Sequence, residues 1–343
     1  MKNYFFLLLA FSFPVFSIGQ TITDYEVKKI WDQGDHNAFT DLILFNGKFY
    51  CSFREGSGHV PGDEDVDGTV RIISSKDGVK WESVSLLKTE GIDLRDPKLS
   101  ITPDNRLMVI IGGSDYDKHK LNGRNPYVSF SSDGVQFSNP RPIVIDPEIN
   151  SGFDWVWRVT WHDGVGYAVD YQYDGVNRAY VVRTTDGIHY ENVSELYISG
   201  RPNEATVRFS PSGEMFIYLR REEHGKEGLL LRSKYPFQEY TWVNLENRLG
   251  GPNFIFVPKT DMLILGTRLY YKSGAKAGLY LSDYHGNQEL IAEFPSAGDT
   301  SYPGLLWHDD HLWISYYSSH EGKTNIYLTK IKQSDIYQAI RGY

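Results

Sequence analysis

The feature that most constrains the fold of this chain is a strand-rich unit that occurs six times along it. Each unit begins with an apolar strand, a polar turn and a second apolar strand, and continues with two further strands joined by a turn. The units start near Asp41, Asp96, Val156, Glu204, Pro252 and Tyr302. Four strands in about 50 residues are typical of one blade of a β-propeller. The sequence therefore predicts an all-β chain, a six-bladed β-propeller of four-stranded blades.

A short turn sequence at similar places in three of the units supports this prediction. Residues 74–81, 131–137 and 184–190 each contain a hydroxyl residue, then Asp-Gly, then an aromatic residue three positions after the glycine. Asp-Gly is a strong signal for a tight turn between strands. We expect the aspartate to accept hydrogen bonds from the turn backbone and the aromatic ring to hold the turn against its sheet.

The first residues differ from the repeat. Residues 1–19 contain one charge, Lys2, then an apolar run over 4–16 and small residues before Gln20. This pattern is typical of a cleavable signal peptide, and the run is too short for a membrane-spanning helix; an uncleaved anchor is the alternative. We expect a signal peptide over 1–19, a single propeller domain over 20–343, and a secreted or periplasmic protein without a lipid-anchoring cysteine.

Two local elements are also expected near the ends of the mature chain. Segment 22–30 has no unit of its own, so it would close the ring by pairing with residues 326–328 of the last unit. A short helix is expected near residues 334–341.

Composition excludes several classes of function. The 343 residues carry 44 acidic and 35 basic side chains, for a formal net charge of −9. This charge argues against a nucleic-acid partner, although an acidic protein can still bind an anionic substrate at a locally basic site. The single cysteine, Cys51, excludes an intramolecular disulfide and a cysteine-rich zinc site. We expect no cofactor, no membrane span and a monomer.

One acidic segment resembles half of a calcium-binding loop. Asp63, Asp65 and Asp67 alternate before Gly68, as the first oxygen ligands and the glycine of such a loop do. The position where a calcium loop needs a bidentate glutamate is Ser74. A solvated or catalytic acidic loop is therefore favoured over a metal site.

Arginines are concentrated where a propeller usually binds its ligand. Ligands meet the end of the central channel at which first strands begin and second strands end. Five arginines fall at such points, next to Asp96 in one case: Arg54, Arg95, Arg158, Arg220 and Arg268. Arginine binds carboxylate and sulfate groups in a planar, bidentate way, so these residues predict a site for an anionic ligand. Alternatively, single arginines would pair structurally with Asp41, Glu55 or Asp96.

Residues 35–330 resemble the sialidase (neuraminidase) superfamily. The Asp-Gly turns are similar to the Asp boxes, or BNR repeats, of that family. Segment 203–209 with the following Arg220 resembles the sialidase segment in which Asn-Glu opens a strand and an arginine follows one hairpin later. Segment 301–305 resembles the one that carries the nucleophilic tyrosine, and Arg268 lies where the family has another arginine.

The resemblance implies an exo-acting glycoside hydrolase for an acidic glycan. Tyr302 would be the nucleophile and Glu204 its base, while Arg220 and Arg268 would bind the acid group of the sugar. A neutral tyrosine suits such a substrate, because a carboxylate nucleophile would repel the carboxylate of the sugar. The family's acid/base is an aspartate on the loop after the second strand of the first blade. The candidates on that loop here are Asp63, Asp65 and Asp67.

The chain departs from the family pattern at the start of the first blade. Residues 36–41 contain no arginine, whereas sialidases place there the first of three arginines that bind the carboxylate. Arg54 or Arg95 would have to replace it. The expected substrate is therefore sialic acid or another acidic sugar.

Two other classes of function stay open. A polysaccharide lyase on the same scaffold would use His59 or Tyr302 as its base, and a non-catalytic propeller would only bind the glycan. Geometry distinguishes them: the hydrolase interpretation needs the Tyr302 hydroxyl within hydrogen-bond reach of Glu204, facing Arg220 and Arg268.

Overall fold

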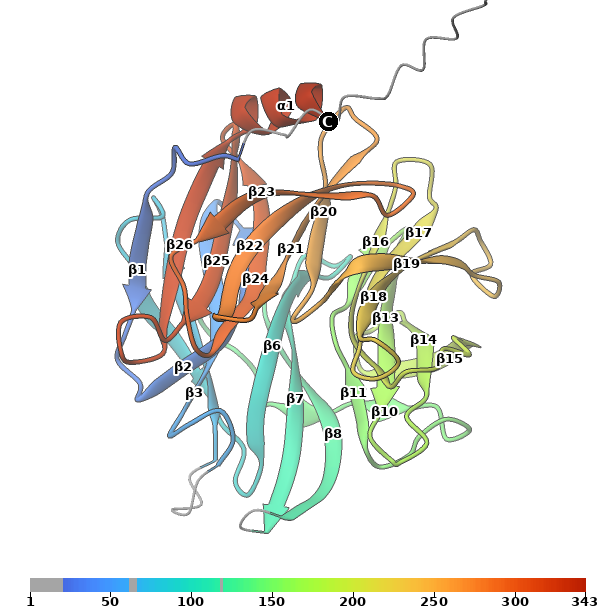
Figure 1. Cartoon of the computed structure of the whole chain (residues 1–343). Coiled ribbons are helices and arrows are strands. Elements are labelled where there is room, and N and C mark those ends of the chain that lie inside the picture. The colour runs from blue at the N-terminus through green and yellow to red at the C-terminus, as the bar shows by residue number, and fades with distance from the viewer. Residues whose placement is uncertain (1–20, 62–66, 118–119) are drawn as a thin grey trace, which may run out of the picture.

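The computed structural model describes residues 21–61, 67–117 and 120–343, which form six β-sheets arranged in a ring (Figure 1). The six-bladed β-propeller predicted from the repeat is thus confirmed. The predicted signal peptide lies outside the described residues. No helix in the described ranges is long and apolar enough to span a membrane.

Each blade is built mainly from consecutive antiparallel strands, and the first strand of each repeat unit lies innermost. In blade 3 the short strand over 144–145 instead lies at the outer edge and pairs parallel with the last strand. Blades 1 and 2 contain β2 (His36–Phe45), β3 (Lys48–Gly56), β4 (Thr69–Ser75) and β5 (Glu82–Leu87), then β6 (Asp93–Ile101), β7 (Leu107–Asp117), β8 (Lys120–Ser131) and β9 (Arg141–Pro142). Blade 3 contains β10 (Val144–Ile145), β11 (Asp154–Val156), β12 (Thr160–His162), β13 (Val165–Gln172), β14 (Ala179–Thr184) and β15 (His189–Glu195). Blades 4 and 5 contain β16 (Pro202–Phe209), β17 (Met215–Arg221), β18 (Glu227–Ser233) and β19 (Thr241–Arg248), then β20 (Asn253–Phe256), β21 (Met262–Tyr271), β22 (Gly274–Asp283) and β23 (Gln288–Phe294). Blade 6 contains β24 (Thr300–His308), β25 (His311–Ser318), β26 (Asn325–Lys332) and the N-terminal β1 (Val27–Trp31).

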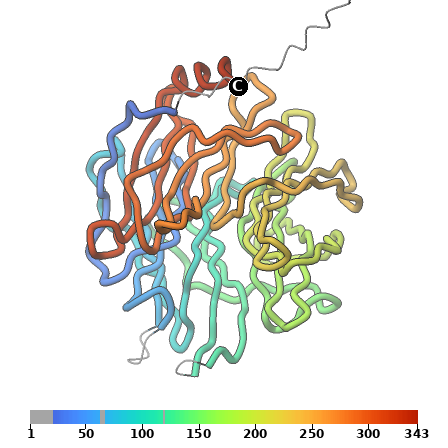
Figure 2. The backbone as a smooth tube through the Cα atoms, viewed as in Figure 1, coloured from blue at the N-terminus to red at the C-terminus, as the bar shows by residue number. Residues whose placement is uncertain are grey.

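The ring is closed by strands from opposite ends of the chain. β1 pairs antiparallel with β26, with Lys28 opposite Leu328, and so becomes the outer strand of blade 6. Figure 2 shows the blue N-terminal segment beside the red C-terminal strands. Inside the ring, β2 contacts both β6 and β24, which joins the first blade to its two neighbours. The predicted pairing is confirmed, and α1 (Gln333–Gly342) confirms the predicted short helix.

The Asp-Gly turns make the hydrogen bonds expected of them. Asp77 Oδ1 accepts the backbone N–H groups of Val79 and Lys80 at 2.8 and 3.0 Å. Asp133 and Asp186 hold the equivalent turns of blades 2 and 3 in the same way. The indole of Trp81 donates to Gly78 O at 3.2 Å, so the aromatic residue also ties the turn to its own blade.

The innermost strands share an irregularity that the sequence pattern does not reveal. In blades 1, 2, 4 and 6, two residues of the first strand lie opposite a single residue of the second strand. The paired residues are Phe39–Thr40, Asp96–Pro97, Asn203–Glu204 and Tyr302–Pro303. Such bulges re-aim side chains and are common beside active sites. Phe39, Asp96 and Tyr302 have φ angles of 67°, 51° and 54°, a conformation that is costly for residues with a side chain.

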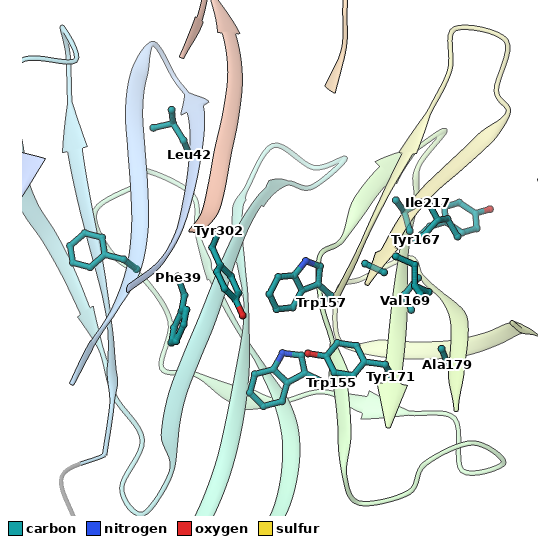
Figure 3. Close-up of a cluster of buried hydrophobic side chains, with 14 of the residues drawn as sticks. Phe39, Leu42, Trp155, Trp157, Tyr167, Val169, Tyr171, Ala179, Ile217 and Tyr302 are labelled. Atoms are coloured by element: carbon teal, nitrogen blue, oxygen red, sulfur yellow. The ribbon is translucent and has the colours of Figure 1, made fainter. Parts of the chain in front are cut away.

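The bulged residues lie within a buried aromatic cluster. Figure 3 shows Tyr302 between Phe39 and Trp157, with Trp155 and Tyr171 next to them. The ring centroid of Tyr302 is 5.0 Å from that of Phe39 and 5.4 Å from that of Trp157. The core therefore fixes the position of the tyrosine that the sequence singled out as nucleophile.

Candidate active site

Tyr302 of blade 6 and Glu204 of blade 4 are in direct contact. The Tyr302 hydroxyl donates a hydrogen bond to Glu204 Oε1. The other carboxylate oxygen lies 2.7 Å from Arg220 Nη1 and accepts the Gly251 N–H at 2.6 Å. Tyr302 and Glu204 are both less than one-tenth exposed. The geometry that distinguishes the hydrolase interpretation is thus present for this pair and Arg220.

Gly251 is part of this arrangement, although sequence reasoning missed it. Its φ is +60°, and a Cβ at this position would lie 2.7 Å from atoms of the Tyr302 ring. Glycine therefore provides both the conformation that presents the N–H to Glu204 and the space that Tyr302 fills. The sequence signal was the Gly250-Gly251-Pro252 run directly before the first strand of blade 5.

Electrostatics favour a neutral phenol beside a charged carboxylate. Burial disfavours ionised Glu204, but the charge of Arg220 and the hydrogen bonds to the carboxylate outweigh it, so the pKa of Glu204 lies below its ordinary value. Burial, and then the charges of Glu204 and Asp96, raise the pKa of Tyr302 well above its ordinary value. In this state Glu204 can accept the phenolic proton when Tyr302 reacts.

Arg268 of blade 5 lies next to the segment of β24 that carries Tyr302. Its Nε donates to Thr300 O at 2.7 Å, two residues before Tyr302, and its Nη2 donates to the Tyr317 hydroxyl at 3.3 Å. Electrostatic interactions couple Arg268 to both Tyr302 and Arg220. The structure therefore brings Arg220 and Arg268 to the Tyr302–Glu204 pair, as the sequence interpretation required.

Arg95 approaches the same centre from blade 2. Its guanidinium lies over the Phe39 ring, 5.1 Å from the centroid, and interacts electrostatically with Tyr302. Its nitrogen atoms remain 3.8 and 3.9 Å from carboxylate oxygens of Asp96 and Asp93. These distances exceed a hydrogen bond, so the N–H groups of Arg95 are available to an anion. Phe39 belongs to the segment where an arginine was expected, and Arg95 supplies positive charge beside it.

Several buried polar atoms of this centre are unsatisfied within the described residues. They are Asp96 Oδ1, Asn203 Oδ1 and Arg220 Nε. Burial raises the pKa of Asp96, which lies beside Arg95 and Lys98. Buried polar atoms without partners are rare in folded proteins, so these three atoms are candidates to hydrogen-bond a polar ligand.

Lys98 is a second residue that sequence reasoning missed. It is 2% exposed, and its Nζ lies 4.8 Å from the Trp157 ring centroid and 5.3 Å from that of Tyr302. Burial lowers the pKa of Lys98 to about 8. A lysine inside the innermost strand of blade 2, two positions after Asp96, was the available signal.

Two predicted substrate-binding arginines are instead engaged in buried ion pairs. Arg54 is fully buried; its Nη2 and Nε lie 2.6 and 3.1 Å from Asp93 Oδ1, and its Nη1 donates to Gly58 O. Arg158 Nη1 lies 2.6 Å from Asp41 Oδ2. These ion pairs tie blade 1 to blades 2 and 3, so for these two arginines the geometry favours structural pairing over the expected binding of substrate. Arg54 has its donors engaged within the protein rather than available to replace the missing arginine.

The predicted acid/base loop is only partly described. Asp63 and Asp65 of the calcium-type loop lie outside the described residues, whereas Asp67 is described and half-buried. His59 of the same loop places Nδ1 2.9 Å from Asp299 Oδ2, which also lies 2.9 Å from His36 Nε2. The three ligand-type atoms lie within 4.8 Å of one another. Both nitrogens are at hydrogen-bond distance from the carboxylate, so we describe this as a hydrogen-bonded group.

No protein-family model and no curated protein sequence matches the chain, whereas many solved structures do. A protein of unknown function from Dyadobacter fermentans has a TM-score of 0.76 at 20% identity, covering 91% of this chain and 100% of its own. Trypanosoma rangeli sialidase in complex with sialic acid has a TM-score of 0.71 at 11% identity, over 94% of this chain and 61% of the sialidase. An α-L-arabinofuranosidase from Fusarium graminearum has a TM-score of 0.65 at 16% identity, over 93% and 98% of the two chains. In fold, this chain is a sialidase-like six-bladed β-propeller.

Proposed function

We propose that this protein is an exo-acting glycoside hydrolase of the sialidase type that releases sialic acid or another acidic sugar. The observation that carries the proposal is the buried contact between the Tyr302 hydroxyl and Glu204, with Arg220 on the second carboxylate oxygen. The proposal includes secretion or export to the periplasm, which the signal-peptide pattern of residues 1–19 supports.

The chemistry follows from this contact. Tyr302 Oη attacks the anomeric carbon while the glycosidic C–O bond breaks, and its proton moves to Glu204 Oε1. An acid protonates the leaving oxygen. Water then attacks the anomeric carbon and gives a proton to the conjugate base of that acid, the bond to Tyr302 breaks, and Glu204 returns the proton to the phenolate. A neutral nucleophile with an adjacent base does not repel a negatively charged sugar.

Arg95, Arg220 and Arg268 would bind the acid group of that sugar. Within the part of the chain that the structure describes, Arg95 lies beyond hydrogen-bond distance of Asp93 and Asp96, and Arg220 Nε is unsatisfied. When a substrate carboxylate takes part of the charge of Arg220, that charge stabilises ionised Glu204 less. Substrate binding would thereby increase the basicity of Glu204 at the moment when it must accept a proton.

The test is hydrolysis of a panel of aryl glycosides that includes an α-sialoside, uronides and an α-L-arabinofuranoside. The arabinofuranoside is included because one structural neighbour is an α-L-arabinofuranosidase. We expect turnover of an acidic member, lost by roughly 1,000-fold or more in Tyr302→Phe. Tyr218→Phe is the matched control, because it removes a buried hydroxyl that bonds to Ser282 rather than to Glu204.

Other outcomes contradict the proposal in distinct ways. Turnover of the arabinofuranoside alone would show a neutral substrate. Release of an unsaturated uronate from a polymer would show a lyase. Equal activity of wild type and Tyr302→Phe would remove Tyr302 from the mechanism, and no turnover of any glycoside would favour a glycan-binding propeller.

A further inference from the structure

His59 and Asp299 form a histidine–carboxylate pair at the edge of the site. The side chain of His59 is 48% exposed, whereas that of Asp299 is 24% exposed. Asp299 Oδ1 accepts the Tyr317 hydroxyl at 2.9 Å, while Oδ2 faces His59 and His36 at 2.9 Å each. Donors from three separate segments therefore hold the carboxylate in place.

The carboxylate fixes which nitrogen of His59 carries the proton. Burial raises the pKa of Asp299, but the hydrogen bonds from His36 and His59 outweigh burial and lower it far below its ordinary value. An ionised carboxylate only accepts hydrogen bonds, so His59 Nδ1 must donate to it. His59 Nε2 is then the atom that can gain or lose a proton.

The position of His59 relative to Tyr302 suits a group that acts on the leaving group. The His59 ring meets the Phe39 ring edge-on at 5.0 Å, and Phe39 lies 5.0 Å from Tyr302 on its other side. His59 also interacts electrostatically with Asp96. Tyr302 is 7% exposed, whereas the His59 side chain is 48% exposed, so His59 lies on the solvent side of the nucleophile.

We propose that His59, oriented by Asp299, is the general acid/base that serves the leaving group in this site; this assignment rests on the hydrolase function proposed above. In the first step protonated His59 gives its Nε2 proton to the glycosidic oxygen as the bond to the anomeric carbon breaks. In the second step neutral His59 Nε2 removes a proton from the attacking water, which restores the starting state. Asp299 is a positioning residue, and His36 helps to hold it.

The test compares two glycosides of the sugar that wild type releases: one with a nitrophenol leaving group, the other with an alkyl alcohol. A nitrophenolate leaves without protonation, whereas an alkoxide needs an acid. We expect His59→Gln to lower kcat/KM at least 100-fold on the alkyl glycoside and less than 10-fold on the nitrophenyl glycoside. Asp299→Asn should show the same preference with a smaller loss. His285→Gln, an exposed histidine of blade 5, is the matched control, and thermal unfolding verifies that each variant is folded.

The competing candidates are tested in the same assay. We expect Asp63→Asn, Asp65→Asn and Asp67→Asn to show no dependence on the leaving group. The assignment is overturned if one of them shows the pattern expected of His59→Gln, or if His59→Gln loses both activities equally or neither. Loss of activity with EDTA and recovery with Zn²⁺ would also overturn it, by making the histidines metal ligands. A wild type that hydrolyses neither glycoside overturns the proposed function itself.

Discussion

A single methyl group at Gly251 is enough to test the geometry of the Tyr302–Glu204 pair. The added Cβ would meet the Tyr302 ring at 2.7 Å, so we expect Gly251→Ala to displace the ring and lower kcat at least 100-fold. Gly91→Ala is the control, because Gly91 has a similar φ of +72° and open space around its Cβ. Both variants should lose about 1 kcal/mol of unfolding stability to the positive φ. Gly251→Ala should lose more because of the clash with Tyr302, and only Gly251→Ala should lose activity. Equal kinetics in the two would show that the contact is unimportant.

From the lowered pKa of Lys98 we expect the free energy of unfolding to rise at alkaline pH. Its pKa is about 8 in the folded protein, against an ordinary value of 10.5. Between these values the unfolded chain binds more protons than the folded one, so the free energy of unfolding increases as pH rises. The shift corresponds to about 3 kcal/mol.

The measurement for Lys98 is denaturant unfolding at several pH values from neutral to about pH 10. Lys98→Met keeps the length of the side chain and removes the titration. The difference in unfolding free energy between wild type and Lys98→Met should therefore change in favour of wild type as pH rises. Parallel pH dependence in the two proteins would show that Lys98 titrates normally.

At this scale the sequence predicted the site only in part. It selected Tyr302, Glu204, Arg220 and Arg268, whose residue types in their strand contexts resemble a known pattern, and the structure brings them together. The sequence could not show that Arg54 hydrogen-bonds Asp93 whereas Arg95 does not, because these contacts depend on how two blades pack together. Asp299 and Lys98 were missed for the same reason, since their contacts come from residues distant in sequence.

At the scale of elements, the turns and strands were predictable and the bulges were not. Asp-Gly turns and apolar strands are local signals, and they located each blade. A bulge depends on which residues of two strands face each other, and no local pattern reports this register. The bulges nevertheless decide the site, because they place Phe39, Asp96 and Tyr302 with φ angles above 50° at the centre of the ring.

The aspartates of the three Asp-Gly turns should make the stability of the fold depend on pH in the acid range. Hydrogen bonds from the turn backbone lower the pKa of Asp77 and Asp133 below the ordinary value of 3.8. For Asp186, burial opposes the shift, but hydrogen bonds from His189 and the backbone outweigh it and lower the pKa further. A carboxylate with a lowered folded pKa stabilises the fold above pH 4, and this contribution is lost as pH falls through the folded pKa.

Replacing all three aspartates by asparagine keeps an acceptor oxygen and removes the titration. We expect the triple variant to be less stable than wild type at neutral pH and to lose less stability on going from about pH 5 to pH 2. Thermal melts across this range provide the measurement, and Asp261→Asn in an exposed turn is the control. A triple variant with the same acid dependence as wild type would contradict a role of these carboxylates in the turns.

At the scale of the whole molecule, the N-terminal segment holds together the blade that carries Tyr302. The Ile22 N–H donates to Ile291 O of blade 5 at 2.7 Å, and Thr329 Oγ1 of blade 6 donates to Glu26 O at 2.8 Å. β1 then covers the outer edge of β26. Residues before the first repeat thus connect the last two blades, and β1 rather than β26 forms the outer edge of blade 6.

Truncation of the N-terminal segment tests this closure in steps. Removing residues 21–23 deletes the hydrogen bond from Ile22 to blade 5, whereas removing residues 21–32 also deletes the contacts of Tyr25 with blade 5 and β1 itself. We expect the shorter truncation to cost a few degrees in unfolding midpoint and the longer one on the order of 10 °C, because it exposes the edge of β26 and the apolar residues that β1 covers. Hydrogen exchange should show loss of protection in β24, β25 and β26 before the other blades. Activity should fall with that protection, since β24 carries Tyr302. If the truncation through residue 32 has the unfolding midpoint and hydrogen exchange of wild type, blade 6 is stable with three strands. The contacts between inner strands would then be sufficient to close the ring without β1.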